Sequence, residues 1–364
     1  METQYFKDYS PALGREMECK VYGHAGRPML FIPCQDGRFF DFEDFHMAGT
    51  LAPWIESGQI MVISIDTIDQ ETWSDTNGDP YWRIRRYEQW IRYIVEEVVP
   101  KIQYIAKERN GWDSLPGVIA FGCSLGATHA VNLYLRFPYL FDGCLALSGI
   151  YTAKYGFGDY MDEVVYQNSP VDYMANFPTD HPYMDLYRSR KAVICCGQGA
   201  WEQPDTTRQL KQIFEQKGIP VWVDLWGYDV KHDWDWWYQQ VVYYMPYNRH
   251  EHQVHKWFLN RKRHAVVISA SPDFLLNEIQ KRLGFEDLLC TRHNKKTGAI
   301  IGKNCRDEEK VKRLFELYNN EDIKIIDVYS DSLKHDKPIF SLGENCYHIV
   351  KGNKIPFKFK DIYG

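Results

Sequence analysis

The pentapeptide Gly122-Cys123-Ser124-Leu125-Gly126 has residue types suited to nucleophilic chemistry, because it matches the pattern Gly-x-Ser-x-Gly. An apolar run at residues 117–121 ends directly before it, and helical spacing of apolar residues begins at Leu125. A sharp turn between a strand and a helix lifts a serine hydroxyl above a sheet and aims the first helix amides at a developing oxyanion. We therefore predict Ser124 as a nucleophile and the Leu125 N–H as an oxyanion donor. The alternative is a plain glycine-rich turn in which Ser124 caps the helix.

A serine hydroxyl needs a general base, and His232 is the histidine best placed to supply one. It lies in a loop just after an expected strand at residues 221–225, and it follows Ser124 as the chain order Ser, acid, His requires. His129 falls little more than one helical turn after Ser124, so we expect it to pack on that helix. Two histidines before the pentapeptide stay open as alternatives, His24 and His46.

The acid that orients such a base should follow the preceding strand, expected at residues 192–196, where the loop contains Glu202 and Asp205. Asp205 directly precedes an expected helix at residues 206–217, so N-capping accounts for it and Glu202 is the preferred acid. This acid would hold the histidine tautomer and stabilise the imidazolium. We expect a second oxyanion donor in the loop at residues 33–38, from a backbone amide near Gln35.

Short apolar runs that alternate with longer amphipathic stretches indicate the elements that position these residues. The expected strands are residues 29–33, 60–65, 117–121, 144–147, 192–196 and 221–225, and the expected helices are residues 85–109, 125–136 and 206–217. Pro100 should kink or divide the first of these helices. This alternation predicts an α/β fold with a mainly parallel sheet that helices cover on both faces. The aromatic-rich segment 151–174 is a candidate cover for the site.

The composition is that of an ordinary folded protein, with 364 residues, of which 45% are hydrophobic and 15% aromatic. The first residues lack the apolar segment of a secretory signal, and no apolar run approaches the roughly 18 residues of a membrane helix. Nine scattered cysteines without a Cys-x-x-Cys pair are typical of reduced thiols. We therefore expect a cytoplasmic protein that does not bind a membrane.

Charge usage changes near residue 250 and indicates two pieces. From Glu251 onward there are 21 basic and 16 acidic residues, against 22 and 33 before it, so the net charge of −6 comes from the first piece. Neither piece has the basic patch of a nucleic-acid-binding protein. We predict domains at residues 1–248 and 256–364, joined by a linker at 249–255. The linker contains His250, His252 and His255, which together with His232 suggest a metal site. They lack a recognised ligand spacing, so we interpret this segment as a solvated linker.

Residues 1 to about 246 resemble the esterase-D-like branch of the α/β-hydrolases. The similar stretches include FIPCQDGRFFDFEDFHM, AFGCSLGATHAVNLYLRFP, GQGAWEQPDTTRQL and WGYDVKHDWDWW. The resemblance implies an α/β-hydrolase fold that cleaves small-molecule carboxylic esters or thioesters without a metal or cofactor. It also implies catalytic roles for Ser124 and His232 and favours Glu202 as the acid. The acyl group and the alcohol or thiol stay open.

Residues 256–364 resemble the latter half of haloacid-dehalogenase-type phosphatases, close to phosphoserine-phosphatase-like members. The similar runs are VVISASPDFLLNEIQKRLG, TRHNKKTGAIIGKNCRDEEKVKRL and VYSDSLKHDKPIF. The resemblance implies that Ser269 binds a phosphoryl group, that Lys310 neutralises its charge and that Asp331 holds Mg²⁺. Asp336 would assist, although it falls one position later than the family pattern.

The motif that carries the nucleophile of such phosphatases is missing. They begin with a strand that ends in Asp-x-Asp-x-[Thr/Val], and the closest match here, Asp233-Trp234-Asp235, directly follows His232. The cap region is missing too. We therefore predict a truncated, catalytically inactive second domain whose missing strand favours a homo-oligomer. The predicted function of the chain is a serine esterase. The alternatives are an Mg²⁺-dependent phosphomonoester hydrolase acting through the second domain, and a non-catalytic binding or scaffold protein.

Overall fold

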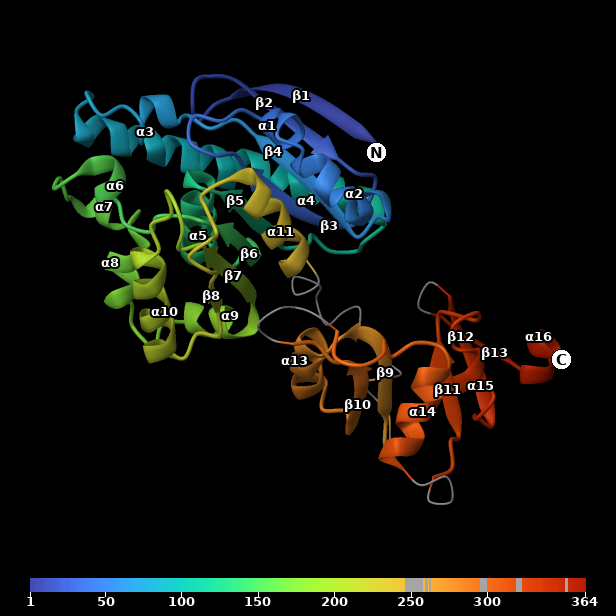
Figure 1. The fold of residues 1–364 in the computed structure, drawn as a ribbon. Coiled ribbons are helices and arrows are strands. Elements are labelled where there is room, and N and C mark those ends of the chain that lie inside the picture. Colours follow the sequence, from blue (N-terminus) through green and yellow to red (C-terminus); the bar gives the residue numbers. More distant parts are fainter. Residues whose placement is uncertain (246–257, 259–260, 262, 295–299, 319–322, 351–352) are drawn as a thin grey trace. The chain divides into compact units, whose positions relative to one another are not determined.

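The computed structural model describes residues 1–245, 258, 261, 263–294, 300–318, 323–350 and 353–364. Contacts within the chain divide it into two compact units, Met1–His250 and Glu251–Gly364 (Figure 1). The linker predicted at residues 249–255, with its three histidines, lies outside the described residues.

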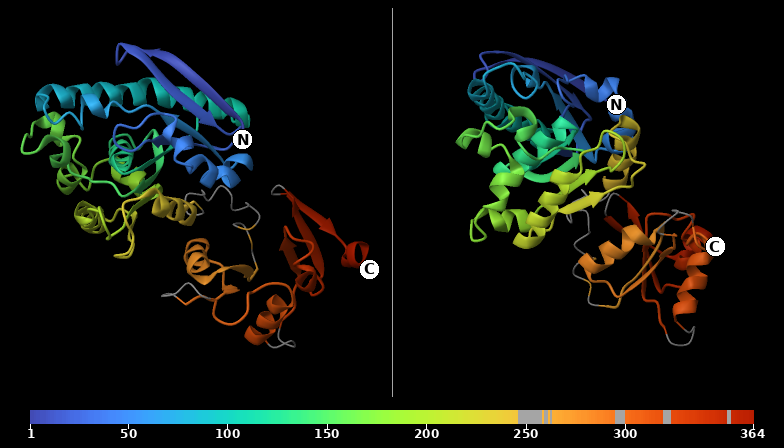
Figure 2. Two further views of the ribbon diagram at one scale, coloured as in Figure 1. Left: turned by 45° about the horizontal axis from the view of Figure 1, so that its top comes forward. Right: turned by 60° about the vertical axis from the view of Figure 1, so that its left-hand side comes forward.

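An eight-stranded sheet forms the centre of the first unit (Figures 1 and 2). Its strands are β1 Thr3–Ser10, β2 Arg15–Tyr22, β3 Arg27–Ile32, β4 Ile60–Ile65, β5 Val118–Cys123, β6 Phe141–Leu147, β7 Lys191–Cys196 and β8 Trp222–Leu225. They lie in the order β1-β2-β4-β3-β5-β6-β7-β8. β1 pairs antiparallel with β2, β2 pairs antiparallel with β4, and the other pairs are parallel. The predicted mainly parallel sheet is confirmed, with an antiparallel edge that the apolar pattern did not indicate.

Helices cover both faces of this sheet. They are α1 Asp41–Asp44, α2 Met47–Glu56, α3 Pro80–Arg92, α4 Val99–Asn110, α5 Leu125–Arg136, α6 Lys154–Phe157, α7 Glu163–Tyr166, α8 Pro170–Ala175, α9 Tyr183–Ser189, α10 Asp205–Lys217 and α11 Trp234–Tyr244. Successive strand residues point to opposite faces. Accordingly, Leu30 and Ile32 of β3 join a core with α3, α4 and α5, whereas Met29 and Phe31 join a core with α1, α2 and α11. The prediction of a sheet covered on both faces is confirmed.

The long helix predicted at residues 85–109 is divided in an unexpected way. A π-helical turn, Tyr93–Val98, separates α3 from α4, and Pro100 lies in the first turn of α4. The backbone keeps right-handed helical angles through this junction. Pro100 has no N–H to continue the α-helical ladder, and a widened turn directly before it accommodates that gap without ending the helix. The helix is therefore divided near this proline, as expected, and the division takes the form of a π-helical turn.

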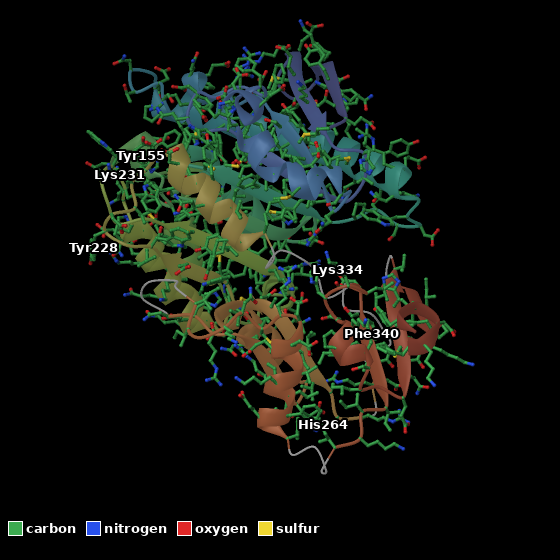
Figure 3. All side chains as sticks on the ribbon, turned by 45° about the vertical axis from the view of Figure 1, so that its right-hand side comes forward. Tyr155, Tyr228, Lys231, His264, Lys334 and Phe340 are labelled. Atoms are coloured by element: carbon green, nitrogen blue, oxygen red, sulfur yellow. The ribbon has the colours of Figure 1, made fainter. Side chains whose placement is uncertain are left out.

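The second unit is a smaller α/β structure. β9 Val266–Pro272 and β10 Asp287–Thr291 pair in parallel, with α13 Asp273–Leu283 between them in sequence. β12 Asn345–Val350 pairs parallel with β11 Asp327–Ser330 and antiparallel with β13 Asn353–Phe357. The unit also contains α14 Glu308–Leu317, α15 Lys337–Phe340 and α16 Phe359–Tyr363. Phe340, labelled in Figure 3, packs with Val328 and Cys346 in a small core of its own.

All nine cysteines are free, and eight of them are buried. Burial raises the pKa of the Cys19 thiol to about 11 and that of Cys34 to about 12. Among the helices of the described residues, none has both the length and the apolar character needed to cross a membrane.

Candidate active site

Ser124 lies at the junction of β5 and α5, in a backbone conformation that few side chains adopt. Its φ is 55° and its ψ is −128°. Residues held in such conformations cluster at functional sites, where the surrounding structure fixes them. The flanking glycines permit the turn: a Cβ on Gly126 would lie 2.2 Å from the Ile32 carbonyl oxygen, and one on Gly122 would lie 2.3 Å from the Gly126 carbonyl carbon. The predicted strand, turn and helix are therefore present around Ser124.

His232 connects Ser124 to a carboxylate. Its Nε2 is 2.9 Å from Ser124 Oγ, and its Nδ1 is 3.2 Å from Glu202 Oε2. The backbone N–H of His232 donates to the Ala200 carbonyl at 3.0 Å, and this bond fixes the loop after β8 against the loop after β7. The Trp237 ring packs edge-on against the imidazole, with ring centroids 4.9 Å apart. About a quarter of the His232 side chain (24%) is exposed, so a small molecule can reach the ring.

Glu202 is enclosed by hydrogen-bond donors. Ser148 Oγ donates to its Oε1 at 2.6 Å, and the Gly197 N–H donates to the same oxygen at 3.0 Å. Burial opposes ionisation of this carboxyl, but hydrogen bonds from His232 and Ser148 outweigh it and hold the pKa of Glu202 below its ordinary value. An ionised Glu202 accepts from His232 Nδ1–H, which leaves Nε2 free to accept the Ser124 proton.

Asp205, the alternative acid, is not brought to this site. It pairs with Arg208 at 2.9 Å, and its side chain is 87% exposed. The expected N-cap role is also wrong, because α10 begins at Asp205 itself and its N-cap residue is Pro204. A carboxylate in the first turn is still favourable there, since it faces the positive end of the helix dipole.

The backbone N–H groups of the loop after β3 differ in whether they are hydrogen-bonded. The Asp36 N–H donates to Asp69 Oδ2 at 3.2 Å, and the Gly37 N–H donates to the Cys34 carbonyl at 2.9 Å. Within the described residues, the Gln35 N–H makes no hydrogen bond. The Gln35 side chain accepts from the Tyr155 hydroxyl at 3.1 Å, so the aromatic segment 151–174 contacts this loop. Tyr155 is half exposed, at the surface of the first unit (Figure 3).

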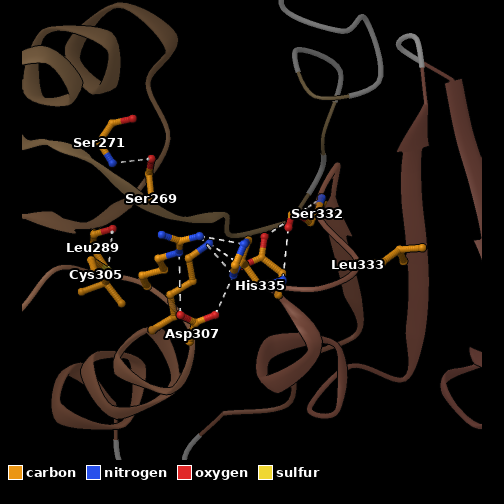
Figure 4. A network of polar contacts seen from close by, with 12 residues as sticks. Ser269, Ser271, Leu289, Cys305, Asp307, Ser332, Leu333 and His335 are labelled. Atoms are coloured by element: carbon orange, nitrogen blue, oxygen red, sulfur yellow. Dashed lines mark hydrogen bonds and ion pairs between the residues drawn. The ribbon is translucent and has the colours of Figure 1, made fainter. Parts of the chain in front are cut away.

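Of the residues singled out in the second unit, two are in direct contact. Lys310 Nζ donates to Asp336 Oδ1, and Ser330 Oγ donates to Asp336 Oδ2. Ser269 is half-buried and accepts from the Ser271 N–H at 3.1 Å (Figure 4). Asp331 is exposed. The structure thus brings Lys310 and Asp336 together, and within the described residues neither Ser269 nor Asp331 hydrogen-bonds to that pair.

These residues do not fit an Mg²⁺ centre. Mg²⁺ needs near-octahedral oxygen ligands, usually with carboxylates among them. Both oxygens of Asp336 are engaged by Lys310 and Ser330, which leaves Asp331 from the implied pair. Across the described residues, no three or more His, Cys, Asp or Glu side chains are grouped closely enough to hold a metal ion.

Comparison with known proteins assigns a family to the first unit. A family model described as Putative esterase matches residues 10–246, well over half of the chain. The chain belongs to the Putative esterase family. The predicted resemblance and the prediction of a carboxylic ester hydrolase are confirmed at the level of this family. A second model, haloacid dehalogenase-like hydrolase, matches residues 224–341 and so begins within the esterase unit.

Solved structures support the fold of the esterase unit. A ferulic acid esterase is 15% identical with a TM-score of 0.52, over 68% of this chain and 97% of that one. An S-formylglutathione hydrolase from Agrobacterium tumefaciens is 14% identical with a TM-score of 0.50, over 68% of this chain and 94% of that one.

A comparison of sequences finds a shorter similarity. Protein CicA from Caulobacter vibrioides is 29% identical over 92 residues. That segment is 24% of this chain, and it spans 41% of the length of CicA.

One residue of the esterase site, Ser148, was missed by sequence reasoning. Ser148 follows β6 with a φ of 60°, and Trp237 of α11 donates from Nε1 to Ser148 Oγ at 3.0 Å. One signal in the sequence could have indicated Ser148. It follows β6, which lies between β5 and β7, the strands that precede Ser124 and Glu202. Of the alternative histidines, His129 is fully buried on α5, as expected, and His46 is the N-cap residue of α2.

Proposed function

We propose that this esterase is a serine hydrolase that cleaves small-molecule carboxylic esters or thioesters through an acyl-enzyme on Ser124. The observation that carries the proposal is the His232 ring, whose two nitrogens face Ser124 Oγ and Glu202 Oε2 at 2.9 and 3.2 Å. A hydroxyl, a base and an orienting carboxylate within hydrogen-bond reach are the groups that this chemistry requires.

In the first half-reaction, Ser124 Oγ bonds to the acyl carbon while His232 Nε2 takes the hydroxyl proton. The carbonyl oxygen becomes an oxyanion, and we assign its donors to the N–H groups of Leu125 and Gln35. Leu125 is the first residue of α5, so its N–H has no acceptor within the helix. The intermediate then releases the alcohol or thiol, which takes the proton from the imidazolium. Glu202 stabilises that imidazolium without accepting its proton.

In the second half-reaction, His232 takes a proton from water, and the water oxygen attacks the acyl carbon. Collapse of this intermediate breaks the bond to Ser124 Oγ, which recovers its proton from His232, and the carboxylic acid leaves. Groups of the first unit supply every proton transfer and charge contact in this sequence. We therefore propose that ester cleavage depends on no added metal or cofactor.

We propose further that the second unit is catalytically inactive. The closest match to a phosphatase nucleophile motif lies at the start of α11, where Asp233 accepts from the Trp234 N–H as an N-cap, so it does not end a strand. The poor fit of Asp331 and Asp336 to Mg²⁺ supports the same proposal. The alternatives, a phosphomonoester hydrolase and a non-catalytic binding protein, become outcomes of the test below.

The test is hydrolysis of p-nitrophenyl acetate, butyrate and octanoate by the full chain with EDTA present. Ser124→Ala should lower kcat at least about 1,000-fold, because removing the nucleophile of such a triad costs several orders of magnitude. Glu202→Gln should lower kcat strongly, whereas Asp205→Asn, the matched acid control, should leave it unchanged. Circular dichroism checks that the variants fold. Ester cleavage that survives in Ser124→Ala would refute the assignment. In a parallel assay without EDTA, cleavage of p-nitrophenyl phosphate that requires added Mg²⁺, with no ester cleaved, would favour catalysis by the second unit.

A further inference from the structure

Three buried polar side chains of the first unit form a continuous hydrogen-bonded network. Tyr87 Oη is 2.8 Å from His129 Nδ1, and His129 Nε2 is 3.1 Å from Asp69 Oδ1. None of the three is more than 2% exposed. Burial raises the pKa of the Tyr87 hydroxyl, so it stays protonated and is able to donate to His129 Nδ1. A carboxylate oxygen accepts, so His129 Nε2–H is the donor in the contact with Asp69.

The second carboxylate oxygen of Asp69 reaches the loop after β3. Asp69 Oδ2 accepts from the Asp36 N–H at 3.2 Å, and Asp36 has a φ of 61°. A non-glycine residue at positive φ keeps that conformation only where its surroundings enforce it. The next backbone N–H along this loop, toward the N-terminus, belongs to Gln35, and within the described residues this N–H makes no hydrogen bond. Asp69 is thus bonded directly beside the second proposed oxyanion donor.

His129, the middle member of this network, lies on α5, the helix that carries the first donor. His129 follows Leu125 by four residues on α5, so the two lie about one turn apart on the same side of that helix. The Trp73 and Trp90 rings pack edge-on against the imidazole, with centroids 5.7 and 5.1 Å away. These contacts fix the position of the ring relative to α5.

We propose that Asp69 and His129 are positioning residues that set the separation of the two oxyanion donors, Leu125 N–H and Gln35 N–H. This inference rests on the proposed function, because it concerns the oxyanion site of that reaction. Burying a carboxylate costs free energy unless its oxygens are hydrogen-bonded. Here the two oxygens of Asp69 connect His129 of α5 to the loop after β3. An apolar side chain would fill the same space, but it would leave the Asp36 amide without an acceptor.

The first test compares kinetics of Asp69→Ala and Asp69→Asn. Asp69→Ala should lower kcat about 10- to 100-fold with KM nearly unchanged, because displacing an oxyanion donor weakens contacts made in the transition state. Asp69→Asn should recover most of kcat, since its amide oxygen still accepts from the Asp36 N–H. Asn168→Ala is the matched control: it removes a fully buried side chain that bonds to Asn132 at the other end of α5. It should lower the melting temperature without lowering kcat.

The second test does not depend on activity. Hydrogen–deuterium exchange of the peptide that spans residues 33–38 should be faster in Asp69→Ala and in His129→Phe than in wild type, and unchanged in Asn168→Ala. Unchanged exchange in that peptide would overturn the proposal that Asp69 and His129 position the loop. A fall in kcat of the same size in Asn168→Ala would overturn it too. If wild type hydrolyses no ester, the proposed function fails by itself, and the exchange result still decides whether Asp69 fixes the loop.

Discussion

Replacing Ser148 by Ala removes one hydroxyl that joins the proposed acid to the helix behind the site. Ser148 Oγ donates to Glu202 Oε1 at 2.6 Å and accepts from Trp237 Nε1 at 3.0 Å. Ser148 and Trp237 are almost fully buried, so water cannot replace the lost partner without rearrangement. The Trp237 ring also packs against His232, so the change reaches two members of the proposed triad.

The magnitude follows from the groups left behind. A hydrogen bond to a charged group contributes about 1.5–3 kcal/mol, and a buried N–H without an acceptor costs about 1–3 kcal/mol. Glu202 keeps its bonds from the Gly197 N–H and from His232, so the loss should fall near the lower ends of these ranges. We expect Ser148→Ala to lower the free energy of unfolding by about 2–4 kcal/mol. We also expect Ser148→Ala to lower kcat about tenfold, which corresponds to about 1.4 kcal/mol of lost transition-state stabilisation.

The assay combines guanidinium unfolding with ester hydrolysis. Ser189→Ala, which removes an exposed hydroxyl at the end of α9, is the control and should change neither quantity. Ser148→Gly separates the backbone from the side chain, because glycine relieves the cost of the positive φ while lacking the hydroxyl. Wild-type stability and kcat in Ser148→Ala would refute the reasoning that this hydroxyl holds Glu202.

Three further expectations follow from the same contacts. Gly126→Ala should abolish activity and lower stability by about 3 kcal/mol or more in guanidinium unfolding, because its Cβ would meet the backbone oxygens of Ile32 and Pro33 at 2.2 and 2.3 Å. The pKa of Glu202 is lowered on folding, so its ionisation stabilises the protein above the ordinary value of 4.5 and this stabilisation is lost as the pH falls through the folded pKa. The melting-temperature advantage of wild type over Glu202→Gln should therefore shrink as the pH falls below the ordinary value of 4.5. Burial raises the pKa of all nine thiols, so iodoacetamide should label the native protein slowly at pH 8 and all nine cysteines after denaturation, as counted by mass spectrometry.

The parts of the site that depend on local sequence could be predicted. The strand at residues 117–121, the turn at Ser124 and the helix after it are adjacent in the chain, so apolar periodicity and two glycines indicate them together. The same holds for β4, whose six buried residues form one apolar run. By contrast, β1 is an edge strand with mostly exposed residues, and it has no apolar pattern to reveal it.

Residues joined through space were harder to predict. Glu202 and Asp205 are three positions apart, and local spacing alone does not decide which side chain turns inward. Ser148 belongs to no motif, because its role depends on Glu202 and Trp237, which lie 54 and 89 residues away in the chain. Asp69 and His129 are 60 residues apart, and nothing in either local segment indicates the other.

The most direct test of the central claim is to locate the acyl group during turnover. The full chain is mixed with p-nitrophenyl acetate, quenched in acid within the first turnovers, digested and mapped by mass spectrometry. We expect a burst of p-nitrophenol and an added acetyl group on the peptide that contains Ser124, with both absent in Ser124→Ala. Steady ester cleavage with the acetyl group on another residue, or a burst that persists in Ser124→Ala, would contradict it.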